Sequence, residues 1–427
     1  MKVMLIGGGG REHCLAWKIK QNPTVKELFC VPGNGGMGSL GRCVPLKSIQ
    51  DIVRFASEKE IDLTFVGPEA PLASGIVDLF QDQGSPIIGP NQAAARLESS
   101  KVYAKNFMKK YQIPTAPFET FDNPATAASF LQSRKDFPLV IKADGLASGK
   151  GVFIVEDEEE AIEVLQEVMT DKIFGSAGNQ IIIEECLEGE EATLMFLFDG
   201  ESYRLLPSSQ DHKRVGDGDV GPNTGGMGAY SPAPVVSEIL LRKIEKQIID
   251  PFIEGTKQEH LDYRGIVYLG LMITRQLEVF VLEFNVRLGD PETQVVLPRL
   301  KNDWIELCFA LLHRSLSQVR IEVSTQPMLG VVLASRGYPG HYDIGKKIEG
   351  LDYFPNDPHG RILVFHAGTQ EKSNDIYSTG GRVLNVCAFG ETLKNAAQNA
   401  YQAVGKICFE NMFYRQDIGY RAFHREE

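Results

Sequence analysis

The first hundred residues alternate short apolar runs with longer amphipathic segments, and glycine or proline closes each apolar run. The runs are VMLI at 3–6, IDLTFVG at 61–67 and PIIGP at 86–90. Helical patterns lie between them, at 11–22 and in the segment that Ser48 opens. Strands that alternate with helices form a parallel sheet with helices on both faces, and ligands bind outside the carboxyl ends of its strands. An α/β N-terminal domain with a binding edge is therefore predicted.

From about residue 101 the pattern changes to β-rich runs. The best candidate for a later domain boundary is the polar, proline-containing segment near 323–328. Three parts are predicted: an α/β domain at 1–102, a large mixed α+β middle at 103–325 and a small α+β domain at 326–427. The predicted strands and hairpins after residue 101 lie at 137–155, 181–189, 194–206, 265–287, 328–335, 361–368 and 381–390.

The composition of the 427-residue chain narrows its class. Its formal net charge is −12 and it has no long Lys/Arg run, which argues against a nucleic-acid partner. No stretch approaches the ~20 apolar residues of a membrane span, and Val3–Ile6 is too short for a signal-peptide core. The seven cysteines are scattered without a CxxC pair, which suits a reducing compartment. A soluble cytoplasmic protein is expected.

The four glycines at the N-terminus, in GGGGREH, raise the question of a dinucleotide site. A dinucleotide fingerprint needs G-x-G-x-x-G and a later acidic residue, but Glu12 stands at the third glycine position and 28–34 ends without an acid. What remains is a glycine loop before a helix, whose free N–H groups favour an anion, with Arg11 beside it. A tight turn without a ligand is the alternative.

A second glycine-rich segment, KADGLASGKGV at 142–152, resembles a Walker A loop but is one residue short. Glycine also replaces the Ser/Thr that binds Mg²⁺, and a strand follows where a helix is required. The segment is predicted to fold over nucleotide phosphates as a lid, with Lys142 as a fixed positive charge; a mobile surface loop is the alternative. The predicted phosphate donors in the loop are Ser148, Gly149, Lys150 and Gly151.

The segment VLEFNVRLGDPE places Glu283 and Asn285 on one face of a predicted strand. Carboxylate and amide oxygens at that spacing suit Mg²⁺. Arg287 continues the face and can hold a carboxylate or a phosphoryl group, and Asp290 lies in the turn that follows. A polar strand facing solvent is the alternative.

Residues 208–232 have little hydrophobic pattern and are either a disordered loop or a binding loop. Asp211 and Lys213 offer charges of both signs, while His212 is given no separate role. In the N-terminal domain, Glu69 of VGPEAPL either holds ribose hydroxyls or caps a turn. The backbone donors predicted in the long loop are Asn223, Thr224, Gly225 and Gly226.

Together these motifs resemble the phosphoribosylamine–glycine ligase family of ATP-grasp enzymes, over essentially the whole chain. The block at 209–234 is long and specific to that family, whereas the glycine loops alone are not. The segments that carry the resemblance are GGREH (9–13), PGN (32–34), VGPEAPL (66–72), IKADGLASGKGV (141–152), SQDHKRVGDGDVGPNTGGMGAYSPAP (209–234), EFNVRLGDPE (283–292), FHAGT (365–369), GGRVL (380–384) and DIGYRA (417–422).

The resemblance implies an ATP-grasp middle domain with a lid subdomain at about 120–190, in a monomer or weak dimer. It implies that glycine attacks the γ-phosphate of ATP to form glycyl phosphate, and that 5-phosphoribosylamine then displaces phosphate to give glycinamide ribonucleotide in purine biosynthesis. ATP and Mg²⁺ (or Mn²⁺) are the implied cofactors.

The resemblance also implies roles for individual residues. Arg287, Asp211 and Lys213 would surround glycine and the acyl phosphate, and Glu283 and Asn285 would bind the metal. The implied ATP contacts are Lys105, Lys142, the lid loop at 145–151, Glu184, Glu185, Cys186 and Leu187 around adenine, and Glu191 at the ribose. The implied phosphoribosylamine contacts are Gly9, Gly10, Arg11, Glu69, Asn223, Thr224, Gly225, Gly226 and Asp290.

Three other functions fit the sequence less well. Another ATP-grasp enzyme, such as a carboxylase acting on a different purine intermediate, should lack the 209–234 block. A nicotinamide oxidoreductase is disfavoured by Glu12, and a nucleotide-binding regulator without turnover by the intact Glu283, Asn285 and Arg287.

Overall fold

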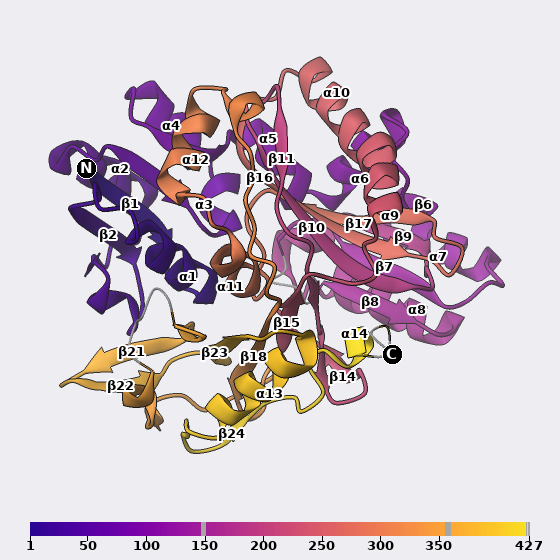
Figure 1. Cartoon of the computed structure of the whole chain (residues 1–427). Coiled ribbons are helices and arrows are strands. Elements are labelled where there is room, and N and C mark those ends of the chain that lie inside the picture. The colour runs from indigo at the N-terminus through magenta and orange to yellow at the C-terminus, as the bar shows by residue number, and fades with distance from the viewer. Residues whose placement is uncertain (147–150, 355–359, 424, 426–427) are drawn as a thin grey trace.

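The computed structural model describes residues 1–146, 151–354, 360–423 and 425. Nine strands of these residues form the largest sheet, in the order β11-β10-β16-β5-β4-β1-β2-β3, with β17 paired to β16 (Figure 1). Its N-terminal strands are parallel, as predicted, and β16 joins β5 in antiparallel orientation. The N-terminal elements are β1 (Lys2–Gly7), α1 (Gly10–Ile19), β2 (Glu27–Pro32), β3 (Arg42–Cys43), α2 (Ile49–Lys59), β4 (Leu63–Val66), α3 (Glu69–Ala73), α4 (Ile76–Asp82), β5 (Ile87–Pro90) and α5 (Gln92–Ser99).

Local sequence signals explain how these helices begin. The hydroxyl of Ser48 accepts a hydrogen bond from the Asp51 amide at 3.1 Å, which confirms the predicted cap of α2. Helix α1 ends at Ile19, three residues before its predicted end, because the chain turns there ahead of Pro23.

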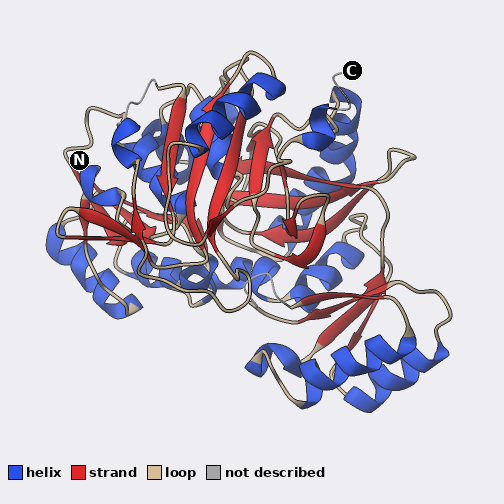
Figure 2. Ribbon diagram, turned by 90° about the horizontal axis from the view of Figure 1, so that it is seen from below, coloured by secondary structure: helices blue, strands red, loops and turns tan. Residues whose placement is uncertain are grey.

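A small antiparallel sheet, β6-β9-β7-β8, follows the N-terminal domain. Figure 2 shows this unit, a sheet with helices on one face, projecting from the rest of the molecule. The two strands predicted on either side of the glycine loop are confirmed, while Ser148, Gly149 and Lys150 lie outside the described residues. The elements here are α6 (Lys101–Lys110), which precedes the sheet, β6 (Phe118–Phe121), α7 (Pro124–Ser133), β7 (Leu139–Ala143), β8 (Val152–Val155), α8 (Glu158–Leu165) and β9 (Ile181–Glu185).

Two long hairpins complete the largest sheet, and both were predicted. In the first, Gly200 has a φ of +90°, which fits the Asp-Gly turn. The second joins β16 to β17, the strand of Glu283 and Asn285. The strands are β10 (Glu190–Phe198), β11 (Tyr203–Leu205), β16 (Tyr263–Ile273) and β17 (Val279–Asn285), and α9 (Glu238–Ile244) and α10 (Asp250–Gln258) lie between β11 and β16 in the chain.

The segment 208–232 is ordered into short strands, which removes the disordered alternative. Two of them extend the C-terminal sheet, whose order is β12-β15-β18-β23-β20. This sheet therefore runs across the domain boundary expected near residue 325, as the largest sheet runs across the one near residue 102. The elements are β12 (Gln210–Asp211), β13 (Arg214–Gly216), β14 (Val220–Asn223), β15 (Gly228–Ser231), β18 (Met328–Ser335), β20 (Ile362–His366), β23 (Arg382–Phe389), α13 (Leu393–Val404) and α14 (Tyr420–Phe423).

Within the described ranges, no helix combines the length and apolar character needed to cross a bilayer.

Candidate active site

Two lysines and one glutamate form a buried cluster between α6 and the small sheet. Lys105 comes from α6, Lys142 from β7 and Glu184 from β9. The Lys142 ammonium lies 2.5 Å from one carboxylate oxygen of Glu184, and Lys105 contacts the other. Burial opposes the charge on Glu184, but Lys142 and Lys105 outweigh it and lower its pKa. The carboxylate placed near adenine from sequence thus neutralises the two lysines assigned to ATP.

The same lysines reach the strand that carries the predicted metal ligands. Lys142 donates to the Leu282 carbonyl at 3.3 Å. Lys105 donates to the Thr115 hydroxyl at 2.6 Å, and that hydroxyl donates to the Val281 carbonyl at 2.7 Å. Burial lowers the pKa of Lys105 to about 8, although Glu184 acts against this. The ammonium groups of Lys105 and Lys142 therefore form a positively charged surface beside β17, here called the cationic wall.

The lid loop begins and ends close to this wall. Lys101 donates to the Gly145 carbonyl at 2.8 Å, and the Ala143 amide donates to the Gly151 carbonyl at 2.9 Å. The turn after β9 follows on the same sheet, with Glu185 exposed and Cys186 and Leu187 half-buried.

Glu283 and Asn285 lie together, as their spacing predicted. The Asn285 amide group donates to Glu283 at 3.4 Å. Burial would raise the pKa of Glu283, but Lys213, Lys142 and Lys101 lower it. Among the described residues, no three His, Cys, Asp or Glu side chains gather as a metal cage. One carboxylate and one amide oxygen suit a cation such as Mg²⁺, which keeps water and phosphate oxygens as its other ligands.

Arg287 is held from several sides. It donates to the Asn285 side-chain oxygen at 3.2 Å and to Glu69 at 3.2 Å, and it pairs with Glu98 at 2.9 Å. The second oxygen of Glu98 accepts from the Val286 amide at 2.8 Å. Sequence reasoning missed Glu98, because a glutamate on an ordinary amphipathic helix carries no signal of burial.

Asp211, Lys213 and Glu191 form a third group. Lys213 pairs with Glu191 at 2.6 Å, so the residue expected at the ribose has a lysine partner in this structure. Burial raises the pKa of Asp211 to about 7, against the influence of Lys213. The Lys213 carbonyl accepts from both the amide and the hydroxyl of Thr224 at 2.8 Å, which ties this group to the loop of backbone donors.

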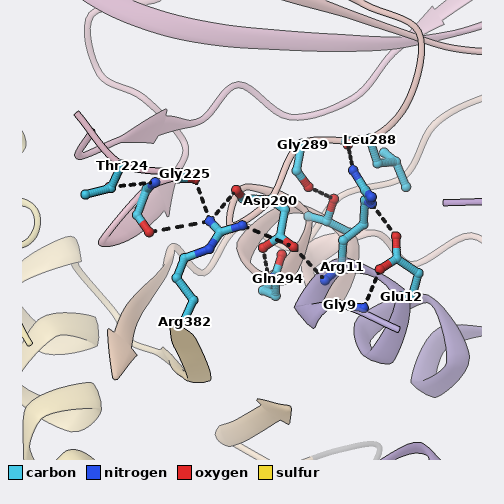
Figure 3. A network of polar contacts seen from close by, with 12 residues as sticks. Gly9, Arg11, Glu12, Thr224, Gly225, Leu288, Gly289, Asp290, Gln294 and Arg382 are labelled. Carbon is cyan, nitrogen blue, oxygen red and sulfur yellow. Dashed lines mark hydrogen bonds and ion pairs between the residues drawn. The ribbon is translucent and has the colours of Figure 1, made fainter. Parts of the chain in front are cut away.

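The N-terminal glycine loop is closed by its own glutamate (Figure 3). Glu12 accepts from the Gly9 amide at 2.6 Å and from the Arg11 guanidinium at 2.5 Å. Arg11 also donates to the Leu288 carbonyl at 3.0 Å. This explains why glutamate replaces the third glycine of a dinucleotide fingerprint: its carboxylate occupies the amide end of α1. Within the part of the chain that the structure describes, the amides of Gly8 and Gly10 have no hydrogen-bond acceptor.

Asp290 joins that loop to two other segments (Figure 3). It accepts from Gln294 at 2.8 Å, lies 3.5 Å from the Arg11 amide and pairs with Arg382 at 3.6 Å. Arg382 also donates to the Asp290 and Gly225 carbonyls, at 2.7 and 2.5 Å. The substrate residues predicted in the glycine loop, in the turn of Asp290 and in the loop of Gly225 therefore lie together.

Thr224 and Asn223 are adjacent in the chain but have different surroundings. The Thr224 hydroxyl accepts from the Gly226 amide at 2.9 Å, whereas Asn223 lies at the end of β14 opposite Arg214, outside the network of Figure 3. Sequence reasoning assigned no role to Arg382, although GGRVL was among the segments that carried the resemblance.

Comparison with known families agrees with this geometry. Models of the phosphoribosylglycinamide synthetase N domain, ATP-grasp (A) domain and C domain match residues 1–98, 99–293 and 328–421. Phosphoribosylamine–glycine ligase of Vibrio vulnificus is 45% identical over 100% of both chains, and that of Halalkalibacterium halodurans is 46% identical over 99% of this chain and 97% of the relative.

A solved structure gives the same result for the fold. The crystal structure of phosphoribosylamine–glycine ligase from Thermotoga maritima has a TM-score of 0.85 and 35% sequence identity, and the match covers 98% of this chain and 100% of that one. The predicted α/β and α+β multidomain fold, with an ATP-grasp domain between the other two, is confirmed. The chain belongs to the phosphoribosylglycinamide synthetase family.

Proposed function

We propose that the site joins glycine to 5-phosphoribosylamine in two steps. The overall reaction follows from the family: the chain is an ATP-dependent ligase of purine biosynthesis. In the first step, a glycine carboxylate oxygen attacks the γ-phosphorus of ATP, ADP leaves and glycyl phosphate forms. In the second, the amine of phosphoribosylamine attacks the acyl carbon, phosphate leaves with the carboxylate oxygen, and the nitrogen loses a proton as the amide forms.

One observation carries this proposal: three groups of charges meet at the end of β17. Lys142 reaches the Leu282 carbonyl, Glu283 and Asn285 follow, and Arg287 comes next. ATP phosphates would lie against Lys105 and Lys142, and glycine against Arg287 and Lys213. Positioning and charge neutralisation of this kind are the main contributions to phosphoryl transfer.

The metal would be held by Glu283 and Asn285. When bound, it would neutralise charge on the phosphate oxygens. Their oxygens fit Mg²⁺ or Mn²⁺ alike, and we propose Mg²⁺ because its preference for water and phosphate ligands matches a site with two protein ligands.

The second substrate would lie between the glycine loop and Asp290. The amides of Gly8 and Gly10 support a phosphate there, and Arg382 orders the facing loop. Arg11 would act by orienting Glu12, since its guanidinium is turned toward that carboxylate. The Asp211 carboxylate, with its pKa raised to about 7, is suited to accept the proton that the amine loses.

We propose the division into 1–102, 103–325 and 326–427, a cytoplasmic location, a monomer or weak dimer, and no nucleic-acid or membrane partner. The net charge of −12 supports the absence of nucleic acid.

An assay of ADP release tests the function. Purified full-length chain is given ATP, Mg²⁺, glycine and phosphoribosylamine made in situ from ribose 5-phosphate and ammonia. ADP release should require both substrates, and glycinamide ribonucleotide should appear by mass spectrometry. ADP release that is unchanged when either substrate is omitted contradicts the proposal.

An isotope experiment tests the glycyl phosphate step. Glycine labelled with ¹⁸O in its carboxylate should transfer one ¹⁸O to inorganic phosphate for each amide formed. Unlabelled phosphate would contradict the acyl phosphate and point to another order of bond formation.

A further inference from the structure

Asp219, to which the sequence assigned no role, is the centre of a charged cluster between the 208–232 segment and the C-terminus. One carboxylate oxygen accepts from Arg415 at 2.8 Å, and the other accepts from the Tyr420 hydroxyl and Arg421 at 2.5 Å. Burial opposes the charge on Asp219, but hydrogen bonds from Tyr420, Arg415 and Arg421 lower its pKa well below the usual range, and the His212 ring lies 3.8 Å away. Arg415 is fully buried. Asp219 pairs with Arg421 and shares Arg415 with Asp417, which lies 2.7 Å from the same guanidinium. A charged carboxylate at Asp219 therefore contributes to neutralising both guanidinium groups.

The C-terminal segment also contacts the residues on both sides of Lys213, the ring of His212 and the backbone of Arg214. The Gly419 amide donates to the His212 ring at 3.0 Å, and Arg415 donates to the Arg214 carbonyl at 3.0 Å. These contacts fix the residues immediately before and after Lys213. The Lys213 side chain, which pairs with Glu191, therefore extends from a position that the C-terminal segment holds through both neighbouring residues.

More contacts lock the turn that contains Asp219. The Gly218 amide donates to Asp417 at 2.8 Å, and the Gln416 amide donates to Asp217 at 2.8 Å. The turn between β13 and β14 is thus bound to the segment DIGYRA and the residues before it, a motif that the proposed chemistry leaves without a role. Hydrogen bonds that run in both directions between the turn and the C-terminal segment hold the turn in one position.

We propose that Asp219, with Arg415 and Arg421, is a positioning residue that holds Lys213 against Glu191 in the ATP-grasp site. The inference rests on the proposed role of Lys213. The C-terminal domain then acts in catalysis through the 208–232 segment, without contact between Asp219 and the reacting atoms. Losing the charge on Asp219 should displace Lys213, and small displacements of a positioning group cost large factors in rate.

Asp219→Asn tests this, with Asp219→Glu as the conservative rescue. The asparagine variant should lower kcat/KM for glycine by about 10-fold or more, mainly through kcat, and the glutamate variant should restore part of it. Mass spectrometry of lysine acylation supplies a readout that does not need turnover. Acylation of Lys213 should rise by about 3-fold or more in Asp219→Asn, because its pairing with Glu191 loosens.

The matched control is Asp375→Asn, which breaks an exposed ion pair with Lys347 of 2.9 Å elsewhere in the C-terminal domain. It should leave kcat and Lys213 acylation unchanged. If Asp219→Asn does not fold, Arg421→Gln makes the same test, since it removes one of the two arginine partners.

Two results overturn the inference: unchanged acylation of Lys213 in a folded variant, or changed acylation with unchanged kcat. Failure of the proposed function would give a different result, namely a wild-type chain that forms no glycinamide ribonucleotide. Acylation of Lys213 is measured without any turnover, so it tests the positioning role separately.

Discussion

The carboxylate of Glu98 pairs with the guanidinium of Arg287 at 2.9 Å; Glu98 is buried and Arg287 is half-buried. Glu98 belongs to the last turn of α5, whereas Arg287 follows β17. The second oxygen of Glu98 accepts from the Val286 amide, so the same carboxylate holds the arginine and the backbone beside it. The N-terminal domain thereby fixes the end of the strand that carries Glu283 and Asn285.

Glu98→Gln should weaken both stability and turnover. The amide keeps an acceptor for Val286 but not the charge, and Arg287 keeps Glu69 as a partner. We expect a loss of about 2–3 kcal/mol in the free energy of unfolding, below the ~3–5 kcal/mol of a fully broken buried pair. We also expect kcat to fall by about 10-fold. Urea unfolding and steady-state assays measure these losses.

Glu60→Gln is the control for this prediction, because Glu60 pairs with Lys2 at 3.7 Å on the surface. A surface pair of this kind contributes within about 1 kcal/mol. Burial raises the pKa of Glu98, so its carboxyl becomes neutral as pH falls. The difference in the free energy of unfolding between the wild type and Glu98→Gln should therefore shrink at low pH. A Glu98→Gln chain that behaves like Glu60→Gln would refute the proposed positioning.

Glu283→Gln should remove the metal dependence of the reaction. The variant keeps the shape of the side chain but loses the carboxylate charge that Mg²⁺ requires. We expect kcat to fall by about 100-fold or more at a Mg²⁺ concentration that saturates the wild type, with an unchanged circular dichroism spectrum. The control is Glu278→Gln, an exposed position on the same hairpin. Normal Mg²⁺ titration of Glu283→Gln would remove the metal assignment.

Lys105 should give the reaction an alkaline limit. Its pKa is lowered to about 8, so its charge is present below pH 8 and is lost above it. If Lys105 binds ATP phosphates, kcat/KM for ATP should fall as pH rises through about 8. Lys105→Arg stays charged and should move the limit to higher pH, whereas Lys109→Arg, exposed on the same helix, should not. An identical profile in Lys105→Arg would exclude Lys105 as the group responsible.

Asp211→Asn should stabilise the chain while it lowers activity. The folded pKa of Asp211 is about 7, above its ordinary value, so the folded state binds the proton more tightly than the unfolded state. The protonated Asp211 carboxyl therefore adds to the free energy of unfolding below about pH 4, and this contribution is lost as pH rises through 7. At pH 8 the asparagine variant should be more stable by up to about 4 kcal/mol, with no such difference at pH 4. Thermal unfolding of the variant and the wild type at both pH values measures this change in stability. An equal difference between the two chains at pH 4 and pH 8 would contradict the prediction.

Local patterns were sufficient for much of the fold. The alternation of strands and helices, the cap at Ser48, the Asp-Gly turn and the common face of Glu283 and Asn285 all depend on residues near one another in the chain. Backbone periodicity and capping act over a few residues, so the sequence alone determines them.

Only the tertiary structure decided which charges meet. Glu184 lies between two lysines, Glu98 holds Arg287 and Arg382 reaches Asp290, and each pair joins segments far apart in the chain. The ordering of 208–232 has the same origin, because β15 obtains its hydrogen bonds from β18. A buried charge is stable only when an opposite charge is brought to it, and packing of distant elements makes that choice. The sequence alone determined which residues were available for the site, and tertiary packing selected their partners.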